Sequence, residues 1–524
     1  MVETTHGASK RVPNEEATGG NDRFDTHKTV ESKGGVSNRN RCPSDVSRLP
    51  NPIRRSIVVI GLVLAHFGVV DRERAVRTAE LAWPRIVTGI ARMSKNAVDV
   101  AMVGIASGTA AITGVGFAGP YWGVAFALGG GVAAGTLALV SQRYGAGRSD
   151  GLGLAVRSSS LLVLLASLPV TAAFWLFSTQ FIAVLTDNAE AVELGARYLR
   201  LVGIGVPFAG LNLVGSRTLV GADDAYIAML LRSGGAVVNV VLSATLIFGL
   251  GMGVEGAAVG TVLSNVVVTA AFVLGLARGG LPVVGEFPIR IDPFGRYVDR
   301  DTVSDIVSIG LPVFGRSLVW TVAEFPMLAI VDGFGENVVA AFVIARRIWG
   351  LMNTPGWGFG LASSSLVGQS LGGDDEDTAE AYGREIVRFA VATYVVSAVL
   401  VAVFAESIVR LFVNDPSSPA IPVAVSLVYA ACLAVVMQGV SGAAAGPLDA
   451  SGDTRVPFYS QLLGMFGCSI PIAYLGAQTG HIEALYVAFL AETTVPAAIN
   501  YYRFTTGKWK QVSQKYRPGA SAGD

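Results

Sequence analysis

Apolar runs long enough to cross a membrane dominate the chain between Thr78 and Arg503. Short polar segments such as GRSDG, TDNAE and LGGDDEDTAE separate them. A transmembrane helix needs about 20 consecutive, mostly apolar residues. The pattern therefore predicts an all-α polytopic membrane protein with twelve transmembrane helices, at about 79–104, 113–140, 155–178, 194–216, 226–249, 254–277, 304–331, 337–366, 384–408, 421–445, 457–478 and 482–503.

The two ends of the chain have a different pattern. Residues 1–50 are rich in Gly, Ser, Thr and charged residues, which predicts a disordered tail. The apolar stretch that follows is short for a span and is succeeded at once by DRERAVR, so residues 51–77 are expected to hold a helix in the membrane interface. Residues 504–524 form a basic tail.

The chain contains an internal repeat. Several positions of the first half match positions of the second half at one offset, which composition alone does not produce. The halves are expected to be two six-helix lobes, 78–277 and 304–503, joined by the linker 278–303. A parallel repeat of this kind places the binding site between the halves, near the middle of the membrane. The matched positions are Trp122-Gly123 with Trp349-Gly350, Gln142 with Gln369, and Gly145 with Gly372.

Basic residues indicate the orientation of the spans. Connections rich in Lys and Arg stay in the cytoplasm. Because the number of spans is even, both termini are predicted to be cytoplasmic, as is the linker, in a multi-pass protein of the cell membrane. The basic residues that carry this prediction are Arg72, Arg74, Arg77, Arg143, Arg148, Arg157, Arg503, Lys508, Lys510, Lys515 and Arg517.

Composition narrows the class of protein. Lys+Arg and Asp+Glu both number 39, and charged residues make up only 15% of the chain against about 25% in soluble proteins. These figures exclude an ordinary soluble enzyme and a nucleic-acid-binding chain. The 3 cysteines and 4 histidines are scattered, so neither a disulfide framework nor a metal site is expected, and no cofactor is predicted.

Ionisable residues line one face of the first predicted span. Arg85, Thr88, Arg92, Lys95 and Asp99 follow the 3–4 spacing of a helix face. Such residues face a bundle interior or a wet cavity, because lipid cannot solvate them. The functional interpretation is that Asp99 binds a proton or another cation. The alternative is that Asp99 pairs with Lys95 and only holds helices together.

Other polar residues inside the predicted spans are candidates for the same cavity. Asn239 and Ser243 share one helix face. A single Ser or Thr more often bonds to its own helix. In the second half, Glu324 is either a second titrating group or the partner of an arginine. The further candidates in the first half are Tyr198, Ser216 and Thr261. The pair Gly131–Gly135 predicts close helix packing.

Several motifs together resemble the multidrug and toxin extrusion (MATE) family: LAWP at 81–84, VDVAMVG at 98–104, SQRYGAG at 141–147, LVGQSLGG at 366–373 and SGDTRVPF at 451–458. The resemblance implies an antiporter that exports cationic or amphipathic small molecules in exchange for H⁺ or Na⁺ by alternating access.

The resemblance also implies site residues. An Asp of the first span lies in a cavity of the first half in prokaryotic relatives, and Asp99 matches it, while Tyr198, Asn239 and Thr261 match further cavity positions. The chain departs from the family at Ser243, where many relatives carry a second Asp. Glu324 stands 12 residues after Pro312, farther than in the branch that carries a Glu there.

The sequence is also compatible with two other functions. One is a flippase for lipid-linked oligosaccharides, which Arg85, Arg92 and Lys95 favour because they would make a basic cavity. The other is a membrane-embedded transferase, although paired acids for a metal are missing. The expected partners are a small-molecule substrate, the coupling ion and membrane lipids, with no nucleic acid, and the chain is expected to be a monomer.

Overall fold

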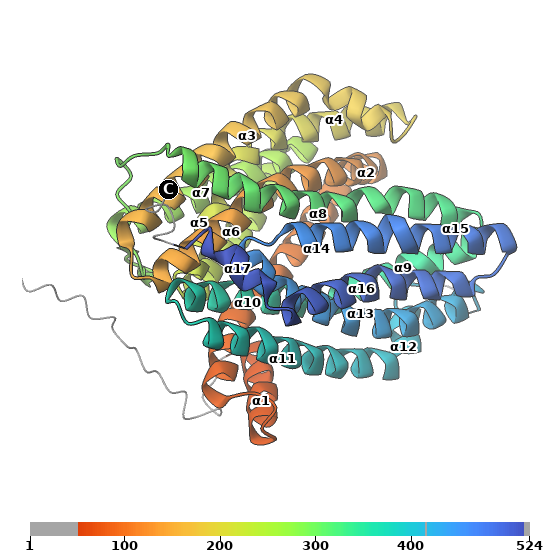
Figure 1. Cartoon of the computed structure of the whole chain (residues 1–524). Helices are drawn as coiled ribbons and strands as arrows, with labels where there is room; N and C mark the ends of the chain where they lie inside the picture. Colours follow the sequence, from red (N-terminus) through yellow and green to blue (C-terminus); the bar gives the residue numbers. More distant parts are fainter. Residues whose placement is uncertain (1–50, 414–416, 518–524) are drawn as a thin grey trace, which may run out of the picture. The chain divides into compact units, whose positions relative to one another are not determined.

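The computed structural model describes residues 51–413 and 417–517, and these are almost entirely helical (Figure 1). The predicted tail 1–50 and the last residues of the predicted basic tail, 518–524, lie outside the described part. The first half of the chain contains α1 (Pro52–His66), α2 (Arg72–Gly145), α3 (Ser149–Ala183), α4 (Ala189–Gly203), α5 (Val206–Gly221), α6 (Ala225–Ala244) with a π-helical extension (Thr245–Gly249), and α7 (Gly253–Arg278).

A short antiparallel strand pair, β1 (Gly280–Leu281) and β2 (Gly285–Glu286), occupies the predicted linker. The second half contains α8 (Arg300–Asp332), α9 (Glu336–Met352), α10 (Thr354–Gly372), α11 (Glu376–Val403), α12 (Ala405–Arg410), α13 (Ala420–Ser451), α14 (Arg455–Leu462), a π-helical stretch (Leu463–Ser469), α15 (Ile470–Thr479), α16 (Glu483–Thr505) and α17 (Lys508–Gln514). Figure 1 shows α8, α15, α16, α13 and α11 running alongside one another, in agreement with the contacts between neighbouring members of this series.

Each of the twelve predicted spans coincides with helix in the described residues, which confirms the all-α polytopic fold. By length and hydropathy alone, 8 helices of the described part qualify as spans, or 9 if the bent pair α4–α5 counts as one. Part of the difference between this number and the twelve predicted spans arises because α2 is counted once but contains the first two predicted spans. The predicted span 194–216 is broken between α4 and α5, with a bend of 50°. The predicted span 337–366 is broken at Asn353, between α9 and α10.

Gly108 separates the two spans inside α2. Its φ of 79° and ψ of −172° are not helical, and this conformation suits glycine because it has no Cβ. A Cβ placed on Gly104 would lie 2.6 Å from the side chain of Ile112. In a continuous helix, positions eight residues apart are separated by about 12 Å along the axis. The chain therefore reverses at Gly108, and the two spans pack against each other.

Close glycine contacts hold the second span of α2 against α8. A Cβ on Gly131 would lie 2.7 Å from the carbonyl oxygen of Gly310, and a Cβ on Gly310 would lie 2.6 Å from that of Gly131. One turn further on, a Cβ on Gly135 would meet the carbonyl of Ile306 at 2.7 Å. Backbones can approach this closely only where side chains are absent. The predicted packing role of the Gly131–Gly135 pair is confirmed.

The segments outside the spans are partly folded. α1 ends at His66 and α2 already begins at Arg72, so the helix expected within 51–77 is shorter than that range. Asp299 caps α8, and hydrogen bonds from the backbone N–H and the hydroxyl of Thr302 hold the pKa of Asp299 below its usual range. The predicted basic tail contains α17, whose Trp509 is fully buried.

Candidate functional site

Asp99 is buried on α2, with 7% of its surface exposed. The Nζ atom of Lys95, one turn earlier, lies 3.1 Å from Oδ2 of Asp99. The ion pair considered from the sequence is therefore present. Because the Asp99 carboxylate is buried in a span, it needs this compensating charge or a bound cation to remain ionised.

Asn239 on α6 makes the second contact with the Asp99 carboxylate. One orientation of its amide satisfies both neighbours. In that orientation the amide nitrogen donates to the two carboxylate oxygens at 3.0 and 3.1 Å, and the amide oxygen accepts from the Thr261 hydroxyl of α7 at 3.1 Å. A chain of polar contacts thus runs from α2 through α6 to α7, and it leaves the carboxylate shared between an ammonium and an amide.

Tyr198 and Ser243 complete this group. Tyr198 on α4 packs against a hydrophobic cluster that includes Met102 and Val103 of α2, and its hydroxyl lies near Thr261 and the Asp99 carboxylate. Ser243 on α6 is fully buried and also lies near that carboxylate. Five of the seven residues predicted from the sequence therefore meet in one place. We call Asp99, Tyr198, Asn239, Ser243 and Thr261 the Asp99 group.

The structure does not bring the other two candidates into the Asp99 group. Ser216 is buried on α5 and lines a different, small cavity that also contains Arg85 and Arg232. Glu324 is exposed on α8, and we find no ion pair or hydrogen bond for its side chain among residues 51–413 and 417–517. Glu324 therefore does not neutralise an arginine of the described bundle.

An ion pair that the sequence reasoning missed lies in the second half. Glu492 on α16 is 1% exposed and accepts two hydrogen bonds from Arg346 on α9, at 2.5 and 3.0 Å. The guanidinium also stacks over Phe489, 4.8 Å from the ring centroid. The signal for Glu492 was available, because it is an acid inside an apolar run. The sequence contained no signal that Arg346 is its partner, because the two residues are far apart along the chain.

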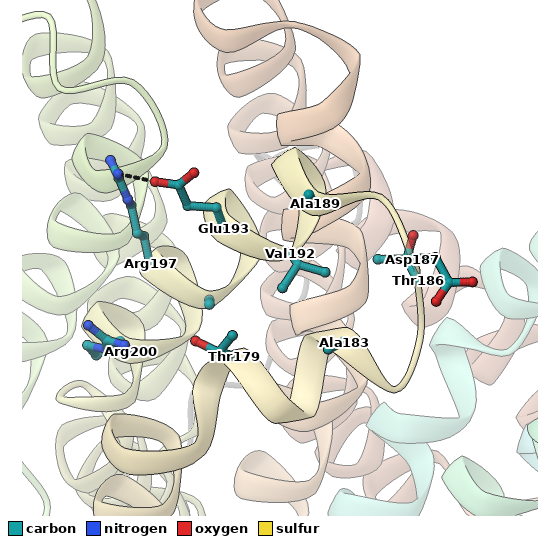
Figure 2. A pocket seen from close by; sticks show the side chains of 10 residues that line it. Thr179, Ala183, Thr186, Asp187, Ala189, Val192, Glu193, Arg197 and Arg200 are labelled. Carbon is teal, nitrogen blue, oxygen red and sulfur yellow. Dashed lines mark hydrogen bonds and ion pairs between the residues drawn. The ribbon is translucent and has the colours of Figure 1, made fainter.

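The larger of the two cavities that we describe is not at the Asp99 group. It has a volume of about 550 Å³ and lies where α3 turns into α4, between Thr179 and Arg200. Figure 2 shows Glu193 and Arg197 of α4 paired at its edge. None of the seven predicted site residues lines it. No group of His, Cys, Asp or Glu suited to a metal ion occurs in the part of the chain that the structure describes.

Comparison with family models decides what kind of protein carries this arrangement. The MatE model matches the chain twice, at residues 84–245 and 312–475. The chain belongs to the MatE family of multidrug and toxin extrusion transporters. One match lies in each half of the chain, which confirms the internal repeat. As a MatE transporter, the chain is a multi-pass membrane protein and not a transferase or other enzyme.

Curated relatives cover most of the MatE chain. The multidrug resistance protein PmpM of Pseudomonas aeruginosa is 28% identical over 405 residues, which are 75% of this chain and 82% of PmpM. A probable multidrug resistance protein NorM of Bradyrhizobium diazoefficiens is 26% identical over 441 residues, 82% of this chain and 92% of that protein.

Solved structures show the same fold. A MOP superfamily transporter from Pyrococcus furiosus has a TM-score of 0.75 at 22% identity and covers 85% of this chain and 97% of its own. An outward-facing multidrug resistance MATE transporter of the same superfamily has a TM-score of 0.74 at 23% identity, over 82% of this chain and 96% of its own.

The two MatE repeats meet each other at one end of the helices. Gln142 donates to the carbonyl of Ala450 at 2.6 Å, and Ser365 donates to the carbonyl of Val220 at 2.7 Å. Gln369 donates to the carbonyl of Gly221 at 3.3 Å. We call this region, formed by residues 140–145, 220–223, 365–373 and 450–453, the gate end.

The contacts of the gate end follow the repeat. A Cβ on Gly145 would lie 2.0 Å from the carbonyl oxygen of Gln369, and a Cβ on Gly372 would lie 1.8 Å from that of Gln142. Gly145 and Gly372 are repeat-related, and so are Gln142 and Gln369. The contact is therefore reciprocal, as across a two-fold axis. Since no Cβ fits at either position, this contact forms only with glycine there.

Replacing Gly372 by valine is expected to open the gate end. Overpacking costs about 1–3 kcal/mol, which corresponds to a shift of about fivefold to a hundredfold toward the open state. The measurement is the labelling rate of Ser216→Cys by a hydrophilic maleimide, in a background whose native cysteines are replaced. Gly350→Val is the matched control, because a Cβ on Gly350 meets nothing within 4 Å. Equal labelling in both variants would contradict the gate.

Proposed function

We propose that this transporter exports cationic and amphipathic small molecules in exchange for H⁺ or Na⁺, and that Asp99 carries the coupling ion. The observation that supports the proposal is the buried Asp99 carboxylate, shared between Lys95 and Asn239. The relatives named as multidrug resistance proteins support small molecules as the cargo.

The chemistry of the Asp99 group supplies a coupling step. A proton on the Asp99 carboxylate removes its negative charge, which ends its attraction for the Lys95 ammonium and weakens the hydrogen bonds from the Asn239 amide to those of a neutral acceptor. The contact between α2 and α6 through that carboxyl group is then weaker. Loss of the proton restores a negative charge that either Lys95 or a cationic ligand can pair with. Proton and cationic substrate thus compete for one group, which couples their movements.

Sodium is the other candidate ion for the same place. Hard cations prefer oxygen ligands. The Asp99 carboxylate and the hydroxyls of Tyr198, Ser243 and Thr261 provide that type of ligand atom. Ser243 stands where many relatives carry an acid, so the Asp99 group contributes one negative charge instead of two.

We further propose that the gate end faces the cytoplasm. Arg77, near the start of α2, donates to Gln369, and Arg143 lies near the end of α2, so both basic residues are at the gate end. Positive residues mark the cytoplasmic side. A closed gate end then corresponds to an outward-facing transporter of the cell membrane with both termini in the cytoplasm. A monomer suffices for this mechanism, because one chain supplies both lobes.

The proposal is tested with purified full-length protein in vesicles loaded with a fluorescent cationic dye. Proton and sodium gradients are imposed separately, each with the membrane potential clamped. We expect one gradient to drive dye against its concentration gradient and the other to have no effect. Absence of dye movement under both gradients would overturn the proposal and favour the flippase, which lipid-linked oligosaccharides would then test directly.

A further inference from the structure

Four arginines cluster inside the first lobe without an acidic partner. Arg85 and Arg92 lie on α2, Arg217 on α5 and Arg232 on α6. Among the described residues none of the four makes an ion pair or hydrogen bond with another side chain or the backbone. Buried guanidinium nitrogens of three of them have no partner at all: Nε of Arg85, Nη1 of Arg217 and Nη1 of Arg232. We call these four residues the arginine cluster.

Aromatic rings are the only favourable neighbours that we find for the cluster among the described residues. The guanidinium carbons of Arg85 and Arg92 lie 5.6 and 5.1 Å from the centroid of Trp357 on α10, and Arg92 lies 5.1 Å from that of Phe126. A cation–π contact contributes about 0.5–2 kcal/mol and accepts no directed hydrogen bond. The buried N–H groups therefore stay unsatisfied, and each such group costs about 1–3 kcal/mol or more.

Repulsion inside the cluster adds to this cost. The charges of Arg92, Arg217 and Arg232 all act on Arg85. Arginine does not lose its proton under physiological conditions, so the cluster cannot neutralise itself. Such an arrangement is unfavourable in the empty protein, and an anion that enters it would relieve both the repulsion and the missing hydrogen bonds.

A small cavity is lined by two of the four arginines of the cluster. Arg85, Arg232 and Ser216 line it from the first lobe, and Leu361 of α10 lines it from the second. Its volume of about 10 Å³ admits at most a single water molecule. Val220, whose carbonyl oxygen accepts the gate hydrogen bond from Ser365, also lines the cavity. An opening of the gate end that breaks this hydrogen bond would therefore move a wall of the cavity.

We propose that the arginine cluster binds the anionic group of an amphipathic substrate, a phosphate or carboxylate, when the gate end opens. Guanidinium groups bind both anions through paired hydrogen bonds. Ser216 adds a hydroxyl, and Trp357 adds an aromatic face for the apolar part of the substrate. The inference rests on the proposed export function and specifies its cargo: the transporter accepts amphipathic compounds that carry an anionic group, zwitterions included.

Binding is tested by calorimetric titration of the full chain in detergent. The probes are inorganic pyrophosphate, as the anion alone, and dodecyl phosphate, as an amphipathic anion. We expect dodecyl phosphate to bind more tightly, and Arg85→Gln with Arg232→Gln to weaken both by about tenfold or more per arginine. Arg200→Gln is the control, because Arg200 is exposed in the separate cavity of Figure 2.

The outcomes separate the possibilities. Equal binding of both probes by wild type and double variant would overturn the inference. Binding of pyrophosphate alone would keep an anion site but overturn the amphipathic substrate class. Gly372→Val should tighten binding of dodecyl phosphate, because it increases the fraction of molecules with an open site. Unchanged affinity in that variant would contradict access through the gate end.

Stability of the ligand-free protein distinguishes a binding role from a structural one. Removing an unpaired buried charge is stabilising, so Arg232→Gln should raise the Tm without ligand and reduce the stabilisation by dodecyl phosphate. A lower Tm would show that Arg232 holds the fold. Binding without gradient-driven dye export would overturn the proposed antiport alone. Dye export with no anion binding would overturn this inference alone.

Discussion

Replacing Asp99 by asparagine is expected to abolish gradient-driven export while the protein still folds. The asparagine side chain has nearly the same shape, but it neither takes up a proton nor carries the charge that a sodium ion or cationic substrate requires. Dye export under the driving gradient should fall to the rate of protein-free vesicles. The measurement is dye flux in vesicles at matched protein content, with folding checked by gel filtration.

Glu193→Gln is the matched control for Asp99→Asn. Glu193 is exposed on α4, where it pairs with Arg197 (Figure 2), and its neutralisation should leave export unchanged. A second variant examines the structural alternative, in which Asp99 only compensates Lys95. In that case Asp99→Asn combined with Lys95→Gln would export dye at the wild-type rate. Recovery of gradient-driven export in this pair would contradict a coupling role for Asp99.

The twelve spans were predictable because each needs a long apolar run, which is a local property of the sequence. The breaks inside two of them also left a local signal. Pro207 follows the break between α4 and α5, and Pro355 follows the break at Asn353. Proline removes a backbone hydrogen bond and disfavours helix in the residue before it. Apolarity alone therefore merged segments that these prolines separate.

The candidate site was predictable where residues lie on one helix face or match a family motif. Asp99 and Lys95 are one turn apart, so their pairing follows from spacing. The arginine cluster was only half visible, because Arg217 and Arg232 join Arg85 through the packing of α5 and α6 against α2. Ser216 was selected correctly as a buried polar residue, but only packing shows that it belongs with the arginines and not with Asp99.

Removing one partner of the ion pair between Arg346 and Glu492 is expected to destabilise the second lobe strongly. Glu492 is buried, both of its oxygens accept from the same guanidinium, and the rings of Phe342 and Phe489 exclude water. Glu492→Gln leaves Arg346 charged and unpaired in that environment. Breaking a buried pair from one side costs about 3–5 kcal/mol, so thermal unfolding in detergent should occur at a clearly lower temperature.

Two further variants identify the unpaired charge as the cause of that loss. Arg346→Met combined with Glu492→Leu removes both charges and should recover most of the stability, since apolar replacement of a whole buried pair is often neutral. Glu406→Gln disrupts an exposed pair with Arg410 and should change stability by less than about 1 kcal/mol. If the double variant were as unstable as Glu492→Gln, lost packing and not an uncompensated Arg346 would be responsible. Unchanged unfolding of Glu492→Gln would contradict the expected cost of leaving Arg346 charged and unpaired.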